Sequence, residues 1–398
     1  MKKILIALFA FVAFFALMGT AQAYDYDDLD IDVDGSDTYA CTLTVNVMDC
    51  WKDTGTVTKW NDIATSAITS EIVGIKKVGS DLHVYYNQFS IASGDVNLHK
   101  LILNTTTGAV ISDVTYLSDY GGMATISKDI PQSATNPAIA WLDKTTGAVK
   151  IDIDGVVDTT GSLGGTPESA GVFIDSLAST SSQVVAVSYK DVSTGDYAVN
   201  NYNTSTNTDD IDIIDSTYLP AYQDLVLFDS TYGKAVIAYQ ETADKDIYVA
   251  YYDGLGYVNT AVVSKTANAV DFEANIEGTN VAIAYTDSDD FRLVVTDENA
   301  SIVRADTSID NSYTSYDQVA LDDGTNGSVA MVERFNATTE SLDEFAYNGA
   351  TYDISNFEEQ GDGAVPELPA NNLWKVLIAV LSLGLVVGIA AFMKKKKK

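Results

Sequence analysis

The sequence predicts an all-β protein built from repeated four-stranded sheets. A run of small and apolar residues ending in an aromatic recurs every 46 to 55 residues, each time followed by a polar turn and another strand-like run. No useful length of helical periodicity separates these runs. Repeats of this length, made of short strands and turns, are typical of a β-propeller. The copies are Val84-Tyr85-Tyr86, Ile139-Ala140-Trp141, Val187-Ser188-Tyr189, Ile237-Ala238-Tyr239 and Ile283-Ala284-Tyr285, with a degenerate copy at Met331-Val332-Glu333.

Each repeat divides into four strand candidates, because turn residues interrupt it three times. One sheet of this size cannot cover both of its faces, whereas sheets stacked around an axis cover one another. We therefore expect the aromatic of each second strand to pack between blades. The expected fold is a β-propeller of six blades, at about 71–117, 118–162, 168–218, 221–264, 269–308 and 314–357. Residues 38–70 add two strand-like runs, which would close the ring, cap it or form a seventh blade.

The repeat resembles the blades of secreted prokaryotic β-propellers, where an I-A-Y-x-D-type strand precedes a Y-A-Y-Y-D-G strand. The likeness is most literal in QVALDDGTNGSVAMVE (318–333) and in VIAYQE followed by VAYYDG, and it extends over roughly 71–357. It implies the propeller fold and little about activity, because such folds serve many functions.

The N-terminal 23 residues have the pattern of a secretory signal peptide. Lys2 and Lys3 precede an apolar run, and Ala21-Gln22-Ala23 forms a small-residue cleavage site. We expect cleavage near Ala23; an uncleaved anchor is the alternative. Residues 24–37 are then predicted to be an acidic leader.

The C-terminal end predicts a membrane anchor. A polar stalk at 358–372 leads to an apolar helix at 373–393 and a basic cytoplasmic tail at 394–398. About 20 apolar residues suffice to cross a bilayer, and the lysines would keep the tail inside. The expected product is a single-pass protein at the cell surface with its N-terminal domain outside.

The same segment resembles the sorting signals of exosortase and archaeosortase substrates, which carry P-E-P or P-E-F before an apolar helix. The matching residues are Val365-Pro366-Glu367-Leu368-Pro369, with Leu368 where the archaeal pattern has Phe. The resemblance implies that the helix is removed and the protein attached to a surface lipid.

Charge and cysteine content restrict the partners and the compartment. The chain has 56 acidic and only 23 basic residues, for a net charge of −33, which disfavours nucleic acid and anionic membranes. Cys41 and Cys50 are predicted to form a disulfide outside the cell. A metal site would need further ligands, and only His83 and His99 could offer imidazole.

Four acidic residues stand two positions after the recurring aromatic, at the start of a turn. A ring of carboxylates there would bind a divalent cation, a cationic ligand or a sugar, whereas the alternative is that each acid simply caps its own turn. These residues are Asp143, Asp191, Glu241 and Asp287.

A second calcium candidate is Asp30, Asp32 and Asp34, followed by Gly35. This is the beginning of an EF-hand-type loop, but its twelfth position is Cys41 rather than a bidentate glutamate. A flexible acidic leader is the alternative. Calcium is the only cofactor that the sequence indicates.

Five N-x-S/T sequences are candidates for glycosylation: Asn104, Asn203, Asn299, Asn326 and Asn336.

No catalytic motif stands out, so we expect a protein that is not an enzyme. Neither histidine lies in a nucleophile motif, and only three arginines could hold a substrate carboxylate. The expected function is binding or adhesion at the cell surface, to a glycan, an envelope protein or another cell. The alternatives are a structural component of an S-layer-like envelope and an extracellular glycan hydrolase.

Overall fold

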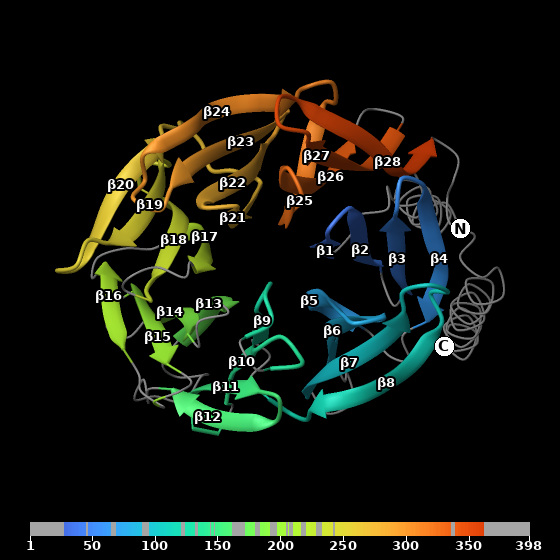
Figure 1. The fold of residues 1–398 in the computed structure, drawn as a ribbon, viewed down its shortest axis with the longest axis horizontal. Helices are drawn as coiled ribbons and strands as arrows, with labels where there is room; N and C mark the ends of the chain where they lie inside the picture. The colour runs from blue at the N-terminus through green and yellow to red at the C-terminus, as the bar shows by residue number, and fades with distance from the viewer. Residues whose placement is uncertain are drawn as a thin grey trace, which may run out of the picture. The chain divides into compact units, whose positions relative to one another are not determined.

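A computed structural model describes residues 28–361 and places them in seven four-stranded sheets around a ring (Figure 1). The chain from Tyr26 to Glu359 forms one compact unit. The predicted signal peptide, the helix at 373–393 and the basic tail lie outside the described residues. Within the described part, no helix has the length and apolarity to cross a bilayer. Internal positions outside the description are 45–46, 65–68, 90–94, 121–123, 132–133, 144, 147, 161–171, 180–183, 192–196, 204–205, 207–209, 216–219, 228–232, 242 and 336–338.

The seven sheets are blades 1 to 7 in chain order, each a meander of four consecutive antiparallel strands. The first three blades are β1 (Asp28–Asp34), β2 (Asp37–Thr44), β3 (Val47–Asp53) and β4 (Val57–Ala64); β5 (Thr69–Val78), β6 (Asp81–Phe89), β7 (Val96–Asn104) and β8 (Val110–Leu117); β9 (Ala124–Ile126), β10 (Ile139–Leu142), β11 (Val149–Ile153) and β12 (Val156–Thr160).

Blades 4 to 7 complete the ring. They are β13 (Val172–Ser179), β14 (Val184–Asp191), β15 (Tyr197–Asn203) and β16 (Ile211–Asp215); β17 (Pro220–Leu227), β18 (Ala235–Glu241), β19 (Ile247–Tyr252) and β20 (Tyr257–Val263); β21 (Asp271–Glu277), β22 (Asn280–Asp287), β23 (Asp290–Asp297) and β24 (Ile302–Asp310); β25 (Ser315–Gly324), β26 (Gly327–Phe335), β27 (Thr339–Tyr347) and β28 (Tyr352–Gly361). In each blade the first strand lies nearest the centre and the fourth forms the rim (Figure 1).

The propeller has seven blades, so the expectation of six is wrong and the alternative of a seventh is confirmed. The additional blade is blade 1, and it is complete. Its inner strand lies in the segment predicted to be a flexible acidic leader, and that prediction is also wrong. The six-blade count followed the aromatic phrase, which the second strand of blade 1, DTYACTLT, does not carry.

Hydrophobic cores lie between blades, and the described residues form one core at each of the seven junctions. The recurring aromatic of the second strand is buried at its junction, as expected: Tyr86, Trp141, Tyr239 and Tyr285 are each at most 5% exposed. Each aromatic faces the preceding blade. Tyr285, for example, packs with Val236 and Val249 of blade 5. Because both faces of every sheet are covered in this way, a similar phrase recurs in blade after blade.

The degenerate copy in blade 7 is shifted by one residue from its predicted alignment. Val332 faces blade 6 and belongs to the core of that junction. Side chains alternate between the faces of a strand, so Arg334 occupies the aromatic position and Glu333 points the other way. The Arg334 guanidinium lies 4.3 Å from the Tyr313 ring and forms an ion pair with Asp343 at 2.7 Å.

Blades 7 and 1 meet without exchanging a strand. Their junction packs Ile31 and Trp51 of blade 1 against Met331 and Leu342 of blade 7. A hydrogen bond also joins the first turns of the two blades, from Thr325 Oγ1 to the Gly35 carbonyl at 2.6 Å. Side-chain packing and bonds between inner strands therefore close the ring.

Candidate functional site

The inner strands surround the central axis of the ring, which we call the channel, and their inward edges pair with no other strand of the described sheets. Buried backbone N–H groups need an acceptor, and here carboxylates of the preceding blade supply it. The β1 carboxylates accept bonds of 2.6–2.7 Å from β5: Asp28 from the Ile72 amide, Asp30 from Ile75 and Asp32 from Lys77. Three further junctions repeat the arrangement: Asp224 accepts from Ala274, Asp271 from Val319, Glu273 from Leu321 and Asp322 from Val33. We call these seven acids the channel carboxylates.

These bonds also fix the direction of the inner strands. Successive acids along β1 bind successive positions along β5, and the same holds for Asp271 and Glu273 against β25. Neighbouring inner strands therefore run in the same direction. It follows that turns between first and second strands and between third and fourth strands share one face of the ring, the lower face. Turns between second and third strands and the connections between blades share the other, the upper face.

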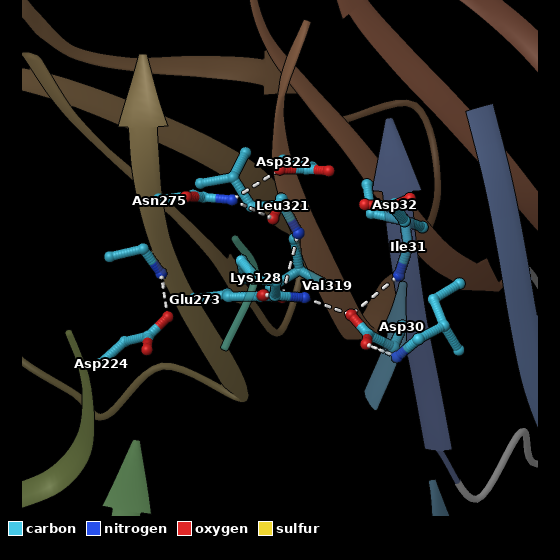
Figure 2. A network of polar contacts seen from close by, with 12 residues as sticks. Asp30, Ile31, Asp32, Lys128, Asp224, Glu273, Asn275, Val319, Leu321 and Asp322 are labelled. Atoms are coloured by element: carbon cyan, nitrogen blue, oxygen red, sulfur yellow. Dashed lines mark hydrogen bonds and ion pairs between the residues drawn. The ribbon is translucent and has the colours of Figure 1, made fainter. Parts of the chain in front are cut away.

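Lys128 supplies positive charge to the channel. Its ammonium pairs with Asp30 and with Glu273, the latter at 3.0 Å, and Asn275 donates a hydrogen bond of 2.8 Å to Asp322 nearby (Figure 2). Burial alone would lower the pKa of Lys128, but the adjacent carboxylates raise it well above its usual value. Lys76 makes a similar pair with Asp32 at 2.5 Å.

Burial has the opposite effect on several channel acids. It raises the pKa of Asp28 to about 8, with a contribution from Glu71, and that of Asp271 to about 6. Burial also raises the pKa of Asp322 to about 7. The acids outnumber the two lysines, so some of them hold a proton near neutral pH. The hydrogen bonds and ion pairs of this network join neighbouring blades, and the net charge of the network depends on pH.

The structure places Asp30, Asp32 and Asp34 in a strand, so the predicted calcium-loop conformation is wrong. Alternate residues of β1 share a face, which points these acids into the channel and toward β5. Ile31, between them, is fully buried in the junction with blade 7. The three carboxylates are paired with Lys128, Lys76 and Lys77 respectively. Across the described residues, no group of three or more His, Cys, Asp and Glu side chains is arranged to hold a metal ion.

The four predicted turn acids all lie at the upper face, at or just after the end of a second strand. Asp143 caps its own turn, accepting bonds from the amides of Thr145 and Thr146 at 3.0 and 2.8 Å. Burial alone would raise its pKa, but Lys150 and Thr146 lower it to about 2. Asp287 pairs with Lys265 of the preceding connection. Glu241 and Asp191 end β18 and β14. The contacts of Asp143 match the turn-capping interpretation, whereas Asp287 forms an ion pair with a neighbouring connection.

Cys41 and Cys50 form the predicted disulfide. They lie directly opposite one another in β2 and β3, with Cα atoms 4.1 Å apart, and both are fully buried at the junction with blade 2. The disulfide therefore pins the two middle strands of blade 1.

His99 is held between two side chains of the rim strand β8. Its Nδ1 lies 3.1 Å from Asp113 Oδ1, and its Nε2 lies 3.3 Å from Thr115 Oγ1. Tyr86 donates a hydrogen bond of 2.9 Å to the other oxygen of Asp113. This acid–imidazole–hydroxyl order is the connectivity of a nucleophile activated by a base. No local sequence motif marks this arrangement, because the three residues come from two strands at positions set only by sheet register.

The lower face carries two tyrosine hairpins, at 252–257 and 347–352. Each places a tyrosine at the end of the third strand and another at the start of the fourth, with ring centroids 5.8 Å apart in the first and 5.2 Å in the second. A cation lies on one ring of each pair: Lys234 is 5.1 Å from the Tyr252 ring centroid and Arg304 is 4.1 Å from that of Tyr347. All four tyrosines are half-buried. The repeated Y-x-x-x-x-Y spacing in the sequence is the signal that could have indicated both hairpins.

The apex of the first tyrosine hairpin is apolar and open to solvent. Leu255 is 95% exposed, the most exposed of the large hydrophobic side chains in the described ring. Tyrosine, with an apolar body and a polar tip, is enriched in protein interfaces, and an exposed leucine beside it adds apolar contact area. The arrangement is suited to contact with a ligand surface.

Comparison with known proteins identifies the fold alone. No protein family and no curated protein sequence matches the chain. A prolyl endopeptidase structure is 10% identical with a TM-score of 0.52 over 83% of this chain and 49% of its own, so the chain spans about half that protein. The fucose-recognising lectin of Aleuria aurantia, a six-bladed β-propeller, is 12% identical with a TM-score of 0.45 over 73% of this chain and 95% of its own. The Cps50 (Swd1) propeller domain of Myceliophteria thermophila is 11% identical with a TM-score of 0.46, over 77% and 96% of the two chains.

Proposed function

We propose that the chain is an extracellular recognition module that binds a glycan or a protein through the lower face of its propeller. The observation that carries the proposal is the pair of tyrosine hairpins on that face, with Leu255 exposed between Tyr252 and Tyr257. Interfaces draw most of their binding energy from a few aromatic and cationic side chains, which is the composition of these hairpins.

One feature supports a location outside the cell, and a second restricts the class of ligand. The Cys41–Cys50 disulfide belongs to an oxidising compartment. The net charge of −33 disfavours nucleic acid as a ligand.

The direction of the strands supports presentation of the lower face. β1 starts and β28 ends at the upper face, so the chain enters and leaves the ring there. A ligand bound at the lower face would therefore not meet the strand ends at which the chain enters and leaves the ring.

Binding to an array of glycans and envelope proteins tests the proposal, using residues 24–370. Leu255→Asp is the first variant, because a side chain that is 95% exposed contributes little to folding. Tyr347→Ala is the second. Each is expected to weaken binding about tenfold or more, the effect of losing one important contact. The matched control is Tyr248→Ala, a half-buried tyrosine of the upper face. Binding that survives both lower-face changes and is lost in the control would reject the proposal.

His99 favours a second candidate function, a hydrolase. In that reaction Thr115 Oγ1 would attack the acyl carbon of an ester and pass its proton to His99 Nε2, while Asp113 orients the imidazole. The bond from the acyl carbon to the alcohol oxygen breaks, the alcohol leaves with the proton from His99, and water then hydrolyses the ester formed on Thr115. A panel of simple esters and glycans distinguishes the two functions. Turnover that disappears in His99→Gln and persists in His83→Gln would favour the hydrolase; absence of turnover in the unaltered chain would reject it.

A further inference from the structure

The four described asparagines of N-x-S/T sequences share a location in the fold. Four of the five asparagines are described, and each belongs to a turn of the lower face. Asn104, Asn203 and Asn299 lie at the turns between the third and fourth strands of blades 2, 4 and 6, and Asn326 lies in the turn between the first and second strands of blade 7. Asn336 follows β26 and lies outside the described residues.

Their surroundings leave at least two of these asparagines open to an enzyme. Asn299 and Asn326 are exposed at hairpin apices. Asn104 is half-buried. Its side-chain oxygen accepts hydrogen bonds from the amides of Thr106 and Thr107 and from the Thr107 hydroxyl. Those bonds use the oxygen of the Asn104 carboxamide, whereas the atom that would be glycosylated is the nitrogen.

We infer that the lower face is modified by N-linked glycans, with Asn299 and Asn104 as the principal sites. The donor would be an oligosaccharide carried on a lipid phosphate or diphosphate. The asparagine Nδ2 forms a bond to the anomeric carbon, the bond from that carbon to the phosphate oxygen breaks, and one amide proton is released. The inference follows from the fold and the N-x-S/T pattern, and it does not depend on which ligand the protein binds.

The hydroxyl residue of each sequence separates the sites further. Ser301, which completes the Asn299 sequence, is exposed. Ser328, which completes the Asn326 sequence, is fully buried, and its hydroxyl donates a hydrogen bond to Glu277. An enzyme that must contact this hydroxyl can therefore reach Asn299 in the folded protein, but it can reach Asn326 only before blade 7 folds against blade 6.

Expression of the full chain in a host with N-glycosylation, followed by glycopeptide mass spectrometry, tests the inference. We expect glycans on Asn299 and Asn104, and loss of one glycan mass in each of Asn299→Gln and Ser301→Ala. Lys144→Asn is the matched control: it creates an N-x-T sequence with Thr146 in an upper-face turn and reports whether the exported chain meets the enzyme. A chain modified at position 144 and at none of its own lower-face asparagines would overturn the inference.

A second measurement uses unmodified protein that is already folded. Incubation with a purified oligosaccharyltransferase and a lipid-linked oligosaccharide is expected to modify Asn299 and to leave Asn326 unmodified. Denatured protein, as the control, should accept a glycan at both positions. Equal modification of Asn326 in the folded and denatured protein would contradict the argument from Ser328.

Discussion

Carboxylates in the central channel take the role that a neighbouring strand has elsewhere in a sheet. Each channel carboxylate accepts a hydrogen bond from a backbone amide of the next blade. Removing such a carboxylate would leave that buried N–H without an acceptor. The acids are close together and poorly solvated, which raises the pKa of several of them. Hydrogen bonding requires the acceptor oxygen and not its charge. The ring is therefore expected to be more stable when some of these groups are protonated.

Asp28→Asn tests this expectation. The pKa of Asp28 in the folded state, about 8, exceeds its unfolded value near 4, so its stabilising contribution is complete below about pH 4 and is lost as pH rises through 8. Asparagine cannot ionise and keeps an oxygen for the Ile72 amide. We expect the variant to match the unaltered protein near pH 4 and to exceed its free energy of unfolding by about 1–3 kcal/mol at pH 8.5.

Urea unfolding at several pH values provides the measurement for Asp28→Asn. The control is Asp289→Asn, an exposed residue of an upper-face turn, whose substitution is expected to change the free energy of unfolding by less than about 0.5 kcal/mol. A variant of Asp28 that is less stable than the unaltered protein at every pH would show that the charge itself is needed.

Lys128→Met removes the cation shared by Asp30 and Glu273. Breaking a buried ion pair from one side costs about 3–5 kcal/mol, because the remaining charges are left without compensation. We expect a loss of that size at pH 8 and a smaller one at pH 5, where more of the acids are protonated. The comparison is Lys77→Met, whose partner Asp34 is 58% exposed and whose loss should cost about 0–1 kcal/mol. Equal losses in the two variants, measured by chemical unfolding, would contradict this account of the channel.

At the scale of single elements, the alternation of side chains between the two faces of a strand is what allowed strands to be predicted from the sequence. The aromatic phrase predicted the second strands and their buried aromatics, because tyrosine and tryptophan between apolar residues have few other positions in a sheet. β1 was missed because the residues on its channel-facing side are all aspartate. Leu29, Ile31 and Val33 alternate with these aspartates, as in any strand. The D-x-D-x-D-G pattern, however, is also the beginning of an EF-hand-type calcium loop.

Residues that act across blades were beyond sequence reasoning. The Asp30 carboxylate binds the Ile75 amide 45 positions away, and its partner Lys128 lies 98 positions away. These distances in sequence are set by blade geometry, which no local pattern encodes. The sequence also did not reveal that Arg334 occupies the position of the recurring aromatic, because blade 7 is shifted by one residue relative to the alignment of the repeats.

Gly108→Ala tests the packing of an element at the junction of blades 1 and 2. Gly108 has φ +68°, and a Cβ there would lie 2.3 Å from the Cγ of Trp60, which is 5% exposed. Gly155 has φ +83° and open space around it. Both alanines carry the backbone cost of about 1–2 kcal/mol, and only Gly108→Ala adds overpacking of about 1–3 kcal/mol. Thermal unfolding of the pair isolates the second effect; equal melting temperatures would show that Trp60 moves aside freely.

At the scale of the whole molecule, the fold depends on closure of the ring between the first and last blades. No strand is exchanged there, and the junction contains buried acids as well as an apolar core. Glu344 and Asp53 are buried on facing blades, and burial raises the pKa of Glu344. The apolar contacts of Ile31 and Trp51 and the bond from the Val33 amide to Asp322 therefore hold the ring closed. β1 contributes to both.

Removal of β1 is the most direct measurement of the central claim, that residues 28–34 are the inner strand of a seventh blade. Two exported chains would be compared by scanning calorimetry, one beginning at Tyr24 and one at Asp37. We expect the longer chain to unfold in one cooperative transition. In the shorter chain we expect this transition to disappear or its melting temperature to fall sharply, because four hydrogen bonds between blades and the contacts of Ile31 are removed. An unchanged melting temperature in the chain that begins at Asp37 would contradict the central claim.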